Sequence, residues 1–206
     1  MKIQEYPIFT IIMRGYTYEQ ADAVLQAVSG FEKYFAIEMT LNTKGALESI
    51  EKLNHIYGDK VYIGAGTVRT LQDAKQAIQV GAQFLLGPHM FTTKMLLLAK
   101  EQNVLAIPAA MTPSEVNKMF ENGADIVKIF PATAVSPNFF KDIQAPLGDL
   151  PLMAVGGVNQ KNAKDFLNNQ ASYLGLGSGL FNKADINERN VNGLANSLER
   201  LIESVQ

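Results

Sequence analysis

Short apolar segments alternate with longer amphipathic segments along the 206 residues of the chain, and this alternation constrains the fold more than any other feature. The apolar segments recur roughly every 20–25 residues, a spacing typical of βα units. They predict eight strands, at Ile8–Met13, Tyr34–Met39, Val61–Ala65, Phe84–Leu86, Val104–Ile107, Ile126–Phe130, Leu152–Val155 and Tyr173–Leu176. The segments between them predict helices over Tyr18–Val28, Ala46–Tyr57, Leu71–Val80, Thr93–Gln102, Ser114–Asn122, Lys161–Asn168 and Val191–Val205.

Eight βα repeats predict an α/β protein, a single (β/α)8 TIM barrel that spans residues 1–206 as one domain. The competing fold is an open doubly wound sheet. Such sheets usually have fewer strands, and the Gly-x-Gly-x-x-Gly fingerprint that often accompanies them is absent after the first predicted strand. The apolar fraction of 47% supports a sizeable core.

Composition and charge argue against several classes of partner. A formal net charge of -2 gives no basic surface for nucleic acid. The chain has no cysteine, so it forms no disulfide, thiolate metal site or cysteine nucleophile. It begins without the pattern of a secretory leader, and no apolar run approaches the roughly 20 residues needed to cross a bilayer. We therefore expect a cytoplasmic protein with no nucleic-acid partner and no membrane partner.

A lysine and a glutamate lie inside predicted strands whose carboxyl ends form the functional face of such a barrel. Lys128 lies on the same face of its strand as Ile126 and Phe130. Glu38 lies on the face of its own strand that has the smaller and more polar side chains. Burial lowers the pKa of a lysine and makes it a usable nucleophile, and a buried glutamate can serve as a general acid or base. The alternatives are a lysine that reaches solvent at the strand end and a glutamate that only pairs with it.

Glycines follow the last two predicted strands, at Gly156-Gly157 and Gly177-Ser178-Gly179. Two such turns in these positions match the phosphate-binding site common in (β/α)8 barrels, although glycines also serve simply to make tight turns. Arg14 follows the first strand and is suited to bind a carboxylate, or is simply solvated.

Three further groups at strand ends give weaker signals. Thr67 follows the flexible Gly64-Ala65-Gly66 segment and offers one hydroxyl for a carboxylate. His89 follows the fourth strand and is either a titratable site group or ordinary polar surface. His, Asp and Glu do not cluster at metal-ligand spacing, so we expect no metal site.

Taken together, the strand ends resemble the 2-keto-3-deoxy-6-phosphogluconate aldolase family. The resemblance runs from Pro7 to about Phe181 and rests on the segments Ile37-Glu38-Met39-Thr40-Leu41, Gly64-Ala65-Gly66-Thr67-Val68, Thr112-Pro113-Ser114-Glu115, Val127-Lys128-Ile129-Phe130-Pro131-Ala132 and Gly156-Gly157-Val158. It implies a class I aldolase of carbohydrate metabolism, of the Entner–Doudoroff type. It also implies a homotrimer that needs no cofactor.

The resemblance implies a role for each site residue. Lys128 is then the Schiff-base lysine and Glu38 the proton shuttle. Three residues would line the pyruvate pocket, namely Thr67, Pro88 and Phe130. The substrate phosphate would bind at Gly156, Gly157, Gly177 and Ser178.

Two positions depart from the gluconate enzymes and resemble the 2-keto-3-deoxy-6-phosphogalactonate aldolases instead. These are Asn42, where many gluconate enzymes have arginine, and Val155, where many have threonine. Arg14 is therefore the expected partner of the substrate carboxylate. The expected reaction converts a phosphorylated 2-oxo sugar acid of either configuration to pyruvate and glyceraldehyde 3-phosphate. Cleavage of 4-hydroxy-2-oxoglutarate and a non-catalytic, phosphate-binding barrel remain the alternatives.

Overall fold

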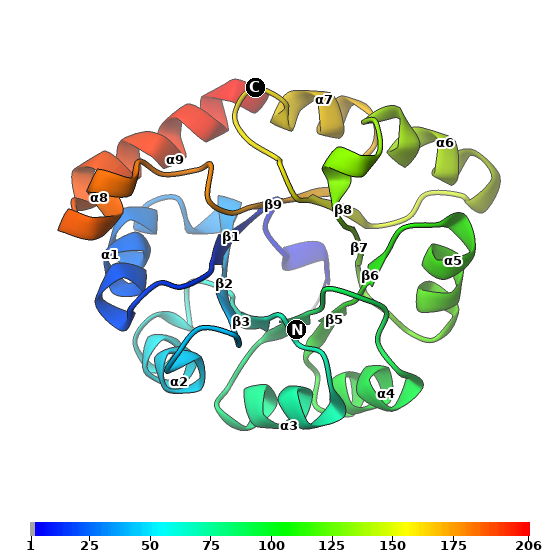
Figure 1. The fold of residues 1–206 in the computed structure, drawn as a ribbon, viewed down its shortest axis with the longest axis horizontal. Coiled ribbons are helices and arrows are strands. Elements are labelled where there is room, and N and C mark those ends of the chain that lie inside the picture. Colours follow the sequence, from blue (N-terminus) through cyan, green and yellow to red (C-terminus); the bar gives the residue numbers. More distant parts are fainter. Residues whose placement is uncertain (1–2) are drawn as a thin grey trace.

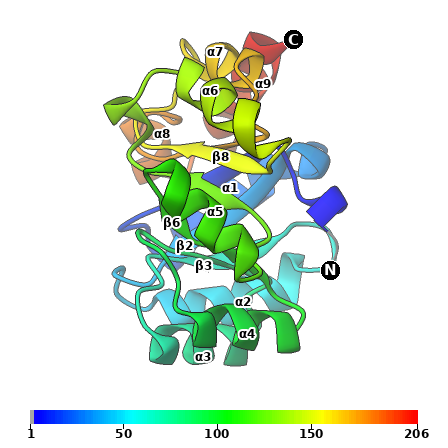
Figure 2. The ribbon, with the colours of Figure 1, turned by 90° about the vertical axis from the view of Figure 1, so that its right-hand side faces the viewer.

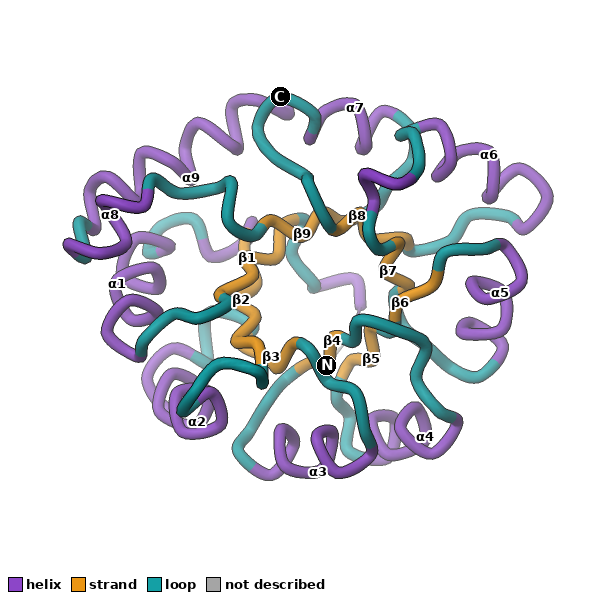
Figure 3. The backbone as a smooth tube through the Cα atoms, in the orientation of Figure 1, coloured by secondary structure: helices purple, strands orange, loops and turns teal. Residues whose placement is uncertain are grey.

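The computed structural model describes residues 3–206, in which nine parallel strands form one sheet around a central axis (Figures 1 and 3). The order around the sheet is β5-β4-β3-β2-β1-β9-β8-β7-β6. This arrangement confirms the predicted (β/α)8 barrel. The strands are β1 (Phe9–Met13), β2 (Phe35–Thr40), β3 (Ile63–Gly66), β4 (Phe84–Leu86), β5 (Leu105–Ile107), β6 (Ala109–Ala110), β7 (Val127–Ile129), β8 (Leu152–Val155) and β9 (Tyr173–Leu176).

The ninth strand arises because Pro108 divides the fifth barrel strand into β5 and β6. Proline has no N–H to donate to a neighbouring strand, and the ladder is interrupted there. β5 pairs with β4 and β6 pairs with β7. The carbonyl of Pro108 still accepts a hydrogen bond of 2.9 Å from Lys128 N. The predicted strand Val104–Ile107 is therefore followed, after this interruption, by β6, and the chain through Pro108 links the two end strands of the sheet.

Helices surround the ring of strands in Figure 1, and the side view of Figure 2 shows helices both above and below the strands. Seven lie close to their predicted ranges: α1 (Tyr18–Val28), α2 (Ala46–Tyr57), α3 (Leu71–Gln79), α4 (Thr93–Glu101), α5 (Pro113–Glu121), α7 (Ala163–Asn168) and α9 (Val191–Val205). Two were missed, α6 (Asn138–Leu147) and α8 (Lys183–Glu188). Short 3-10 helices lie at Ile3–Glu5 (η1), Glu32–Tyr34 (η2) and Ala132–Ala134 (η3). Within residues 3–206, no helix combines the length and apolar character needed to cross a membrane.

Threonine caps fix where several of these helices begin, just after the carboxyl ends of strands. Thr17, Thr70 and Thr112 each accept a hydrogen bond from the third helical residue, whose own side chain bonds back to the cap. This reciprocal pattern satisfies two backbone N–H groups that would otherwise lack partners. The segment Thr112-Pro113-Ser114-Glu115 shows this pattern, and its proline occupies the first helical position.

Side chains on the strands separate into an inner and an outer core, as their alternation predicts. On β2, Phe35, Ile37 and Met39 belong to the outer core between strands and helices, whereas Ala36 belongs to the inner core. On the β7 segment, Ile126 and Phe130 belong to the inner core. Because successive side chains point to opposite faces, Glu38 and Lys128 also face the barrel interior.

Tyr6 fills the amino-terminal end of the interior. Its ring makes edge-to-face contacts with Tyr62, Phe84 and Tyr173, with centroids 5.4–5.8 Å apart. Its hydroxyl lies 2.9 Å from Thr10 Oγ1. Since this end of the barrel is packed with aromatic rings, the open end is the carboxyl end, where the predicted site lies.

We expect Tyr6→Ala to destabilise the protein by about 3–5 kcal/mol, because it removes a buried ring that the barrel cannot replace. Tyr6→Phe should cost only about 1 kcal/mol, since it removes one hydrogen bond. Urea unfolding followed by circular dichroism measures both changes. Ile56→Ala, at a side chain that is 56% exposed, is the control and should change the free energy of unfolding by less than about 0.5 kcal/mol. An equal loss of unfolding free energy in Tyr6→Ala and Ile56→Ala would contradict this role of the ring.

Candidate active site

Lys128 lies in the middle of β7 with its side chain inside the barrel, only 5% exposed. Its strand neighbours are Ala109 on β6 and Met153 on β8, which fix its backbone on both sides. The Nζ atom lies 4.5 Å from the centroid of the Phe130 ring, where the face of the ring attracts a cation. The lysine is therefore held inside the barrel and does not reach bulk solvent.

Glu38 faces the same interior from β2 and is 2% exposed. Its strand neighbours are Ile12 on β1 and Gly64 on β3. The position next along β3 on the inner face is Gly66, where a Cβ atom would overlap the Glu38 carboxyl group. Glycine at this position thus leaves the space that the carboxyl group occupies.

The Glu38 carboxyl group is unusual for a buried group because its Oε2 atom has no hydrogen-bond partner in residues 3–206. Buried polar atoms nearly always have a partner, and the exceptions are often functional. Among the same residues the single ion pair is Lys52–Glu48 on α2, so Glu38 and Lys128 act on each other without ion-pair contact. This geometry leaves the carboxylate oxygen available to a reacting molecule.

Burial shifts the pKa values of both groups toward neutrality. Loss of solvation raises the pKa of Glu38 to about 7, against the smaller opposing effects of Lys128 and Arg14. Loss of solvation lowers the pKa of Lys128 to about 8; Glu38 opposes this shift and Arg14 adds to it. The lysine pKa moves in the direction that its sequence environment predicts. An amine and a carboxyl group that both titrate near pH 7–8 are suited to nucleophilic attack and proton transfer.

A cavity of about 410 Å³ opens at the carboxyl ends of β1, β8 and β9. It contains Arg14 and Phe130 together with the predicted phosphate residues Gly156, Gly157, Gly177 and Ser178. Lys128 and Glu38 are not on its wall. They lie deeper, where Phe130 contacts Lys128 and Ile12 is the strand neighbour of Glu38. Six of the predicted site residues thus surround one opening, and its wall includes one neighbour of each member of the buried pair, Phe130 beside Lys128 and Ile12 beside Glu38.

The Gly156-Gly157 turn adopts a conformation that only glycine tolerates well, with φ values of 100° and 75°. A Cβ at Gly157 would overlap the Thr133 side chain, so the turn also packs closely against the segment after β7. The amides of Asn159 and Asn162 each donate a 3.0 Å hydrogen bond to the Gly157 carbonyl. Because the Gly157 carbonyl accepts both hydrogen bonds, the peptide group that follows Gly157 has a fixed orientation.

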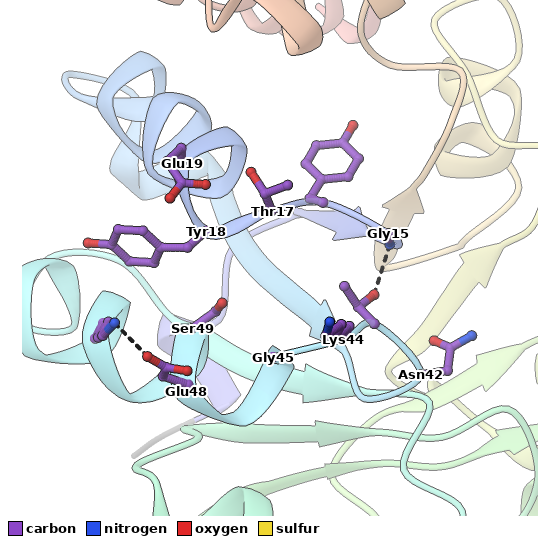
Figure 4. A pocket seen from close by; sticks show the side chains of 12 residues that line it. Gly15, Thr17, Tyr18, Glu19, Asn42, Lys44, Gly45, Glu48 and Ser49 are labelled. Atoms are coloured by element: carbon purple, nitrogen blue, oxygen red, sulfur yellow. Dashed lines mark hydrogen bonds and ion pairs between the residues drawn. The ribbon is translucent and has the colours of Figure 1, made fainter.

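The remaining predicted residues lie at the same end of the barrel but outside this cavity. Thr67 and Pro88 follow β3 and β4 and are half-buried. His89 is exposed, and its Nδ1 lies 2.8 Å from the Met90 carbonyl oxygen. Asn42 lines a second cavity, of about 640 Å³, between the loops after β1 and β2 (Figure 4). Although larger, this second cavity includes neither the buried pair nor the glycine turns, so we place the site at the smaller one.

Several residues of the wall were missed by the sequence analysis, among them Ile12, Tyr16 and Asn159. The alternation that placed Glu38 inside the barrel also places Ile12 there. Ile12 lies on β1, two residues before Arg14, which follows the strand, so both side chains point to the same side. Tyr16 and Asn159 lie in loops, where no periodic pattern indicates direction. Within residues 3–206 no group of three or more His, Cys, Asp or Glu side chains could hold a metal ion.

Comparison with known proteins adds independent information on the family of this chain. Residues 2–196 match the family model described as KDPG and KHG aldolase. The 2-dehydro-3-deoxy-6-phosphogalactonate aldolase of Escherichia coli (strain K12) is 32% identical over 198 residues, which cover 95% of this chain and 95% of that relative.

Two solved structures have the same fold and related sequences. One, described as the native KDPGal structure, has a TM-score of 0.85 and 31% identity, over 96% of each chain. The other is a cube-shaped cage designed by fusing symmetric oligomeric domains, with a TM-score of 0.85 and 30% identity, over 96% of this chain and 73% of that one.

The environment of Lys128 predicts how its amine reacts with an amine-directed reagent at increasing pH. The labelling midpoint should lie near pH 8, and Glu38→Gln should lower it, because the glutamate charge raises the lysine pKa. Mass spectrometry of labelled peptides measures the midpoint. Lys52 is a control within the same molecule, because its hydrogen bond with Glu48 raises its pKa above the ordinary value. A Lys128 midpoint at or above that of Lys52 would contradict the assignment.

Proposed function

Because the chain belongs to the KDPG and KHG aldolase family, we propose that residues 1–206 form one aldolase domain in which Lys128 is the Schiff-base lysine. The protein is a carbon–carbon lyase. It cleaves a 2-dehydro-3-deoxy-6-phospho sugar acid of the phosphogluconate or phosphogalactonate type to pyruvate and glyceraldehyde 3-phosphate. A barrel that only binds phosphate has no use for a buried amine and carboxyl pair, and the matched relative is a catalyst.

The observation that carries this proposal is the placement of Lys128 and Glu38 in one water-poor interior, with pKa values of about 8 and about 7. At neutral pH a usable fraction of the lysine is then neutral, whereas an exposed lysine is almost fully protonated. The carboxyl group can both accept and release a proton over the same pH range.

In the proposed reaction the neutral Lys128 amine attacks the C2 ketone carbon of the substrate and forms a carbinolamine. Glu38 transfers a proton to the departing hydroxyl group, and loss of water gives a protonated imine. Glu38, now ionised, removes the proton of the C4 hydroxyl group. The C3–C4 bond breaks, its electron pair enters the imine to give an enamine, and the aldehyde product leaves. The imine accepts the electrons, so the mechanism requires no metal ion.

The second half of the cycle restores the lysine. Glu38 returns its proton to C3 of the enamine, which becomes the imine of pyruvate. Addition of water to this imine releases pyruvate and the free Lys128 amine, and the proton set free in this step returns to Glu38. Glu38 thus donates two protons and regains two within one turnover, so one carboxyl group suffices for the whole sequence.

The cavity supplies groups for both anionic ends of such a substrate. Backbone N–H groups of the turns at Gly156-Gly157 and Gly177-Ser178 are proposed to hold the phosphate, because glycine lets the backbone approach closely. Arg14 is proposed to bind the carboxylate, since a guanidinium can donate two parallel hydrogen bonds to it. Phe130 would pack against the methylene group in the pyruvate portion of the substrate. Thr67 and Pro88 are proposed to line the pocket for the same portion.

We further propose that the galactonate configuration is the preferred one. Asn42 and Val155 support it, because both resemble the galactonate enzymes. The relative that covers 95% of this chain is itself a 2-dehydro-3-deoxy-6-phosphogalactonate aldolase. A homotrimer and a cytoplasmic location complete the proposal; the likeness to a cage fused from symmetric oligomeric domains supports an oligomer. Cleavage of 4-hydroxy-2-oxoglutarate is a secondary candidate because the matching family model includes KHG aldolases.

Incubation with pyruvate followed by borohydride should fix one pyruvate-derived adduct on Lys128, because reduction of the imine makes its bond permanent. Lys128→Arg should abolish the adduct and reduce kcat by at least about 10⁴-fold, since the electron sink is lost. Peptide mass spectrometry and steady-state kinetics measure the two effects.

Glu38→Gln gives a distinct outcome in the same experiment. It should still form some adduct but at a rate about 10²–10⁴-fold lower, because a proton carrier is lost. A chelator should leave the activity intact. An adduct that persists in Lys128→Arg, or activity abolished by the chelator, would show that the mechanism is wrong.

The two phosphorylated epimers should also be cleaved at different rates. We expect kcat/KM to be at least about ten-fold higher for the galactonate epimer, equivalent to about 1.4 kcal/mol of transition-state binding. Coupled detection of pyruvate from each purified epimer measures this ratio. A preference for the gluconate epimer would overturn the substrate assignment and leave the lysine chemistry unaffected.

A further inference from the structure

Thr43, in the loop between β2 and α2, makes two hydrogen bonds through one hydroxyl group. Its Oγ1 atom accepts a bond of 2.8 Å from the backbone N–H of Gly15, the residue after Arg14 (Figure 4). The same atom lies 3.0 Å from Thr40 Oγ1, within hydrogen-bond distance. Thr43 thus joins the loop after β1 to the end of β2.

Thr40 gives this connection a fixed base. It is the last residue of β2, is fully buried, and shares the inner face of the strand with Glu38. Its backbone is in register with Gly66 on β3. The carbonyl of Thr40 accepts a 2.9 Å bond from Thr43 N, so the turn itself holds the Thr43 side chain close to β2. The hydroxyl of Thr43 is consequently positioned by the sheet.

The bond to Gly15 restricts Arg14 in particular. The N–H of Gly15 belongs to the peptide group that follows the Arg14 Cα, so fixing it limits rotation at ψ of Arg14. On the other side, Met13 is held by its pairing with Met39. Arg14 and Gly15 are both exposed and make no strand pairing of their own. Without Thr43, the base of the Arg14 side chain would therefore lose one of its two fixed points.

We propose that Thr43 is a positioning residue for the aldolase reaction, whose hydroxyl, supported by Thr40, holds Arg14 in place to bind the carboxylate end of the substrate. This inference rests on the proposed function, because it assigns Arg14 a carboxylate to bind. Thr43 itself does not touch the reacting atoms. Its effect reaches the reaction through the backbone of the Arg14–Gly15 loop.

The position of Arg14 also has an electrostatic consequence for the buried pair. The positive charge of Arg14 lowers the pKa of Lys128 and the pKa of Glu38. The titratable groups that act on this pair are Glu38 from β2, Lys128 from β7, Arg14 from the end of β1 and Tyr6, whose own pKa Glu38 raises. An Arg14 side chain that moves away should let both pKa values rise.

The test is Thr43→Val, which keeps the shape of the side chain and removes the hydroxyl. We expect KM for the phosphorylated substrate, and the pyruvate concentration that gives half-maximal borohydride trapping, to rise about five- to ten-fold. The change in kcat should be smaller than two-fold. Both limbs of the pH profile of kcat/KM should move to higher pH by about half a unit. Thr43→Ser, which retains the hydroxyl, should restore values within about two-fold of the original protein.

Two comparisons separate this role from a structural one. Thr93→Val, at an exposed threonine on α4, makes the same chemical change away from the site and should alter nothing. In an Arg14→Met background, Thr43→Val should add less than about two-fold to KM, because the residue it positions is already gone. If Thr43→Val fails to fold, Thr43→Ala replaces it, both alone and in the Arg14→Met background.

Three results would overturn the inference. They are an unchanged KM and pH profile in Thr43→Val, an equal loss in Thr43→Ser, and additive effects with Arg14→Met. Failure of the proposed function has a different signature, because the unmodified protein would then give no pyruvate adduct at all.

Discussion

The loss of solvation around Lys128 and Glu38 is the interaction on which the site depends. A lysine that is 5% exposed and a glutamate that is 2% exposed face each other across a barrel interior. Burial disfavours the charged form of each group and so moves the two pKa values toward each other. Direct ion-pair contact would reverse part of this effect by stabilising both charges. The separation of the two groups therefore preserves the pKa shifts that their burial produces.

The two ends of the barrel perform different tasks with the same architecture. At the amino-terminal end, Tyr6 and its aromatic neighbours fill the interior. At the carboxyl end, small residues on the inner face keep space open. Gly66 leaves room for the Glu38 carboxyl group, and Gly175 lies where a Cβ would crowd Val155 and Ile12. Packing at one end thus supports an open, polar site at the other.

The elements that the sequence predicts best are those with a strong internal period. Strict alternation placed Lys128 and Glu38 inside the barrel. Helix α6 was missed because it follows Pro137 and contains Pro146, residues that usually mark a boundary. Helix α8 has only six residues, too few for a clear helical period. The bond from Thr43 to Gly15 spans 28 positions and involves a backbone N–H, so no local pattern could predict it.

The same burial that prepares the site destabilises the fold near neutral pH. Glu38 has a pKa of about 7 in the folded protein, above its ordinary value of 4.5. The folded state therefore holds this proton more tightly, and the free energy of unfolding falls as pH rises between those values.

Lys128 has a folded pKa of about 8, below its ordinary value of 10.5. The unfolded state holds that proton more tightly, so the full destabilisation is present below pH 8 and diminishes only above it. Between pH 7 and 8 both groups weaken the fold together, over the range in which their mixed protonation suits the proposed reaction. The aromatic packing around Tyr6 and the threonine caps offset this loss from outside the site, so the fold can retain a reactive pair that its own stability disfavours.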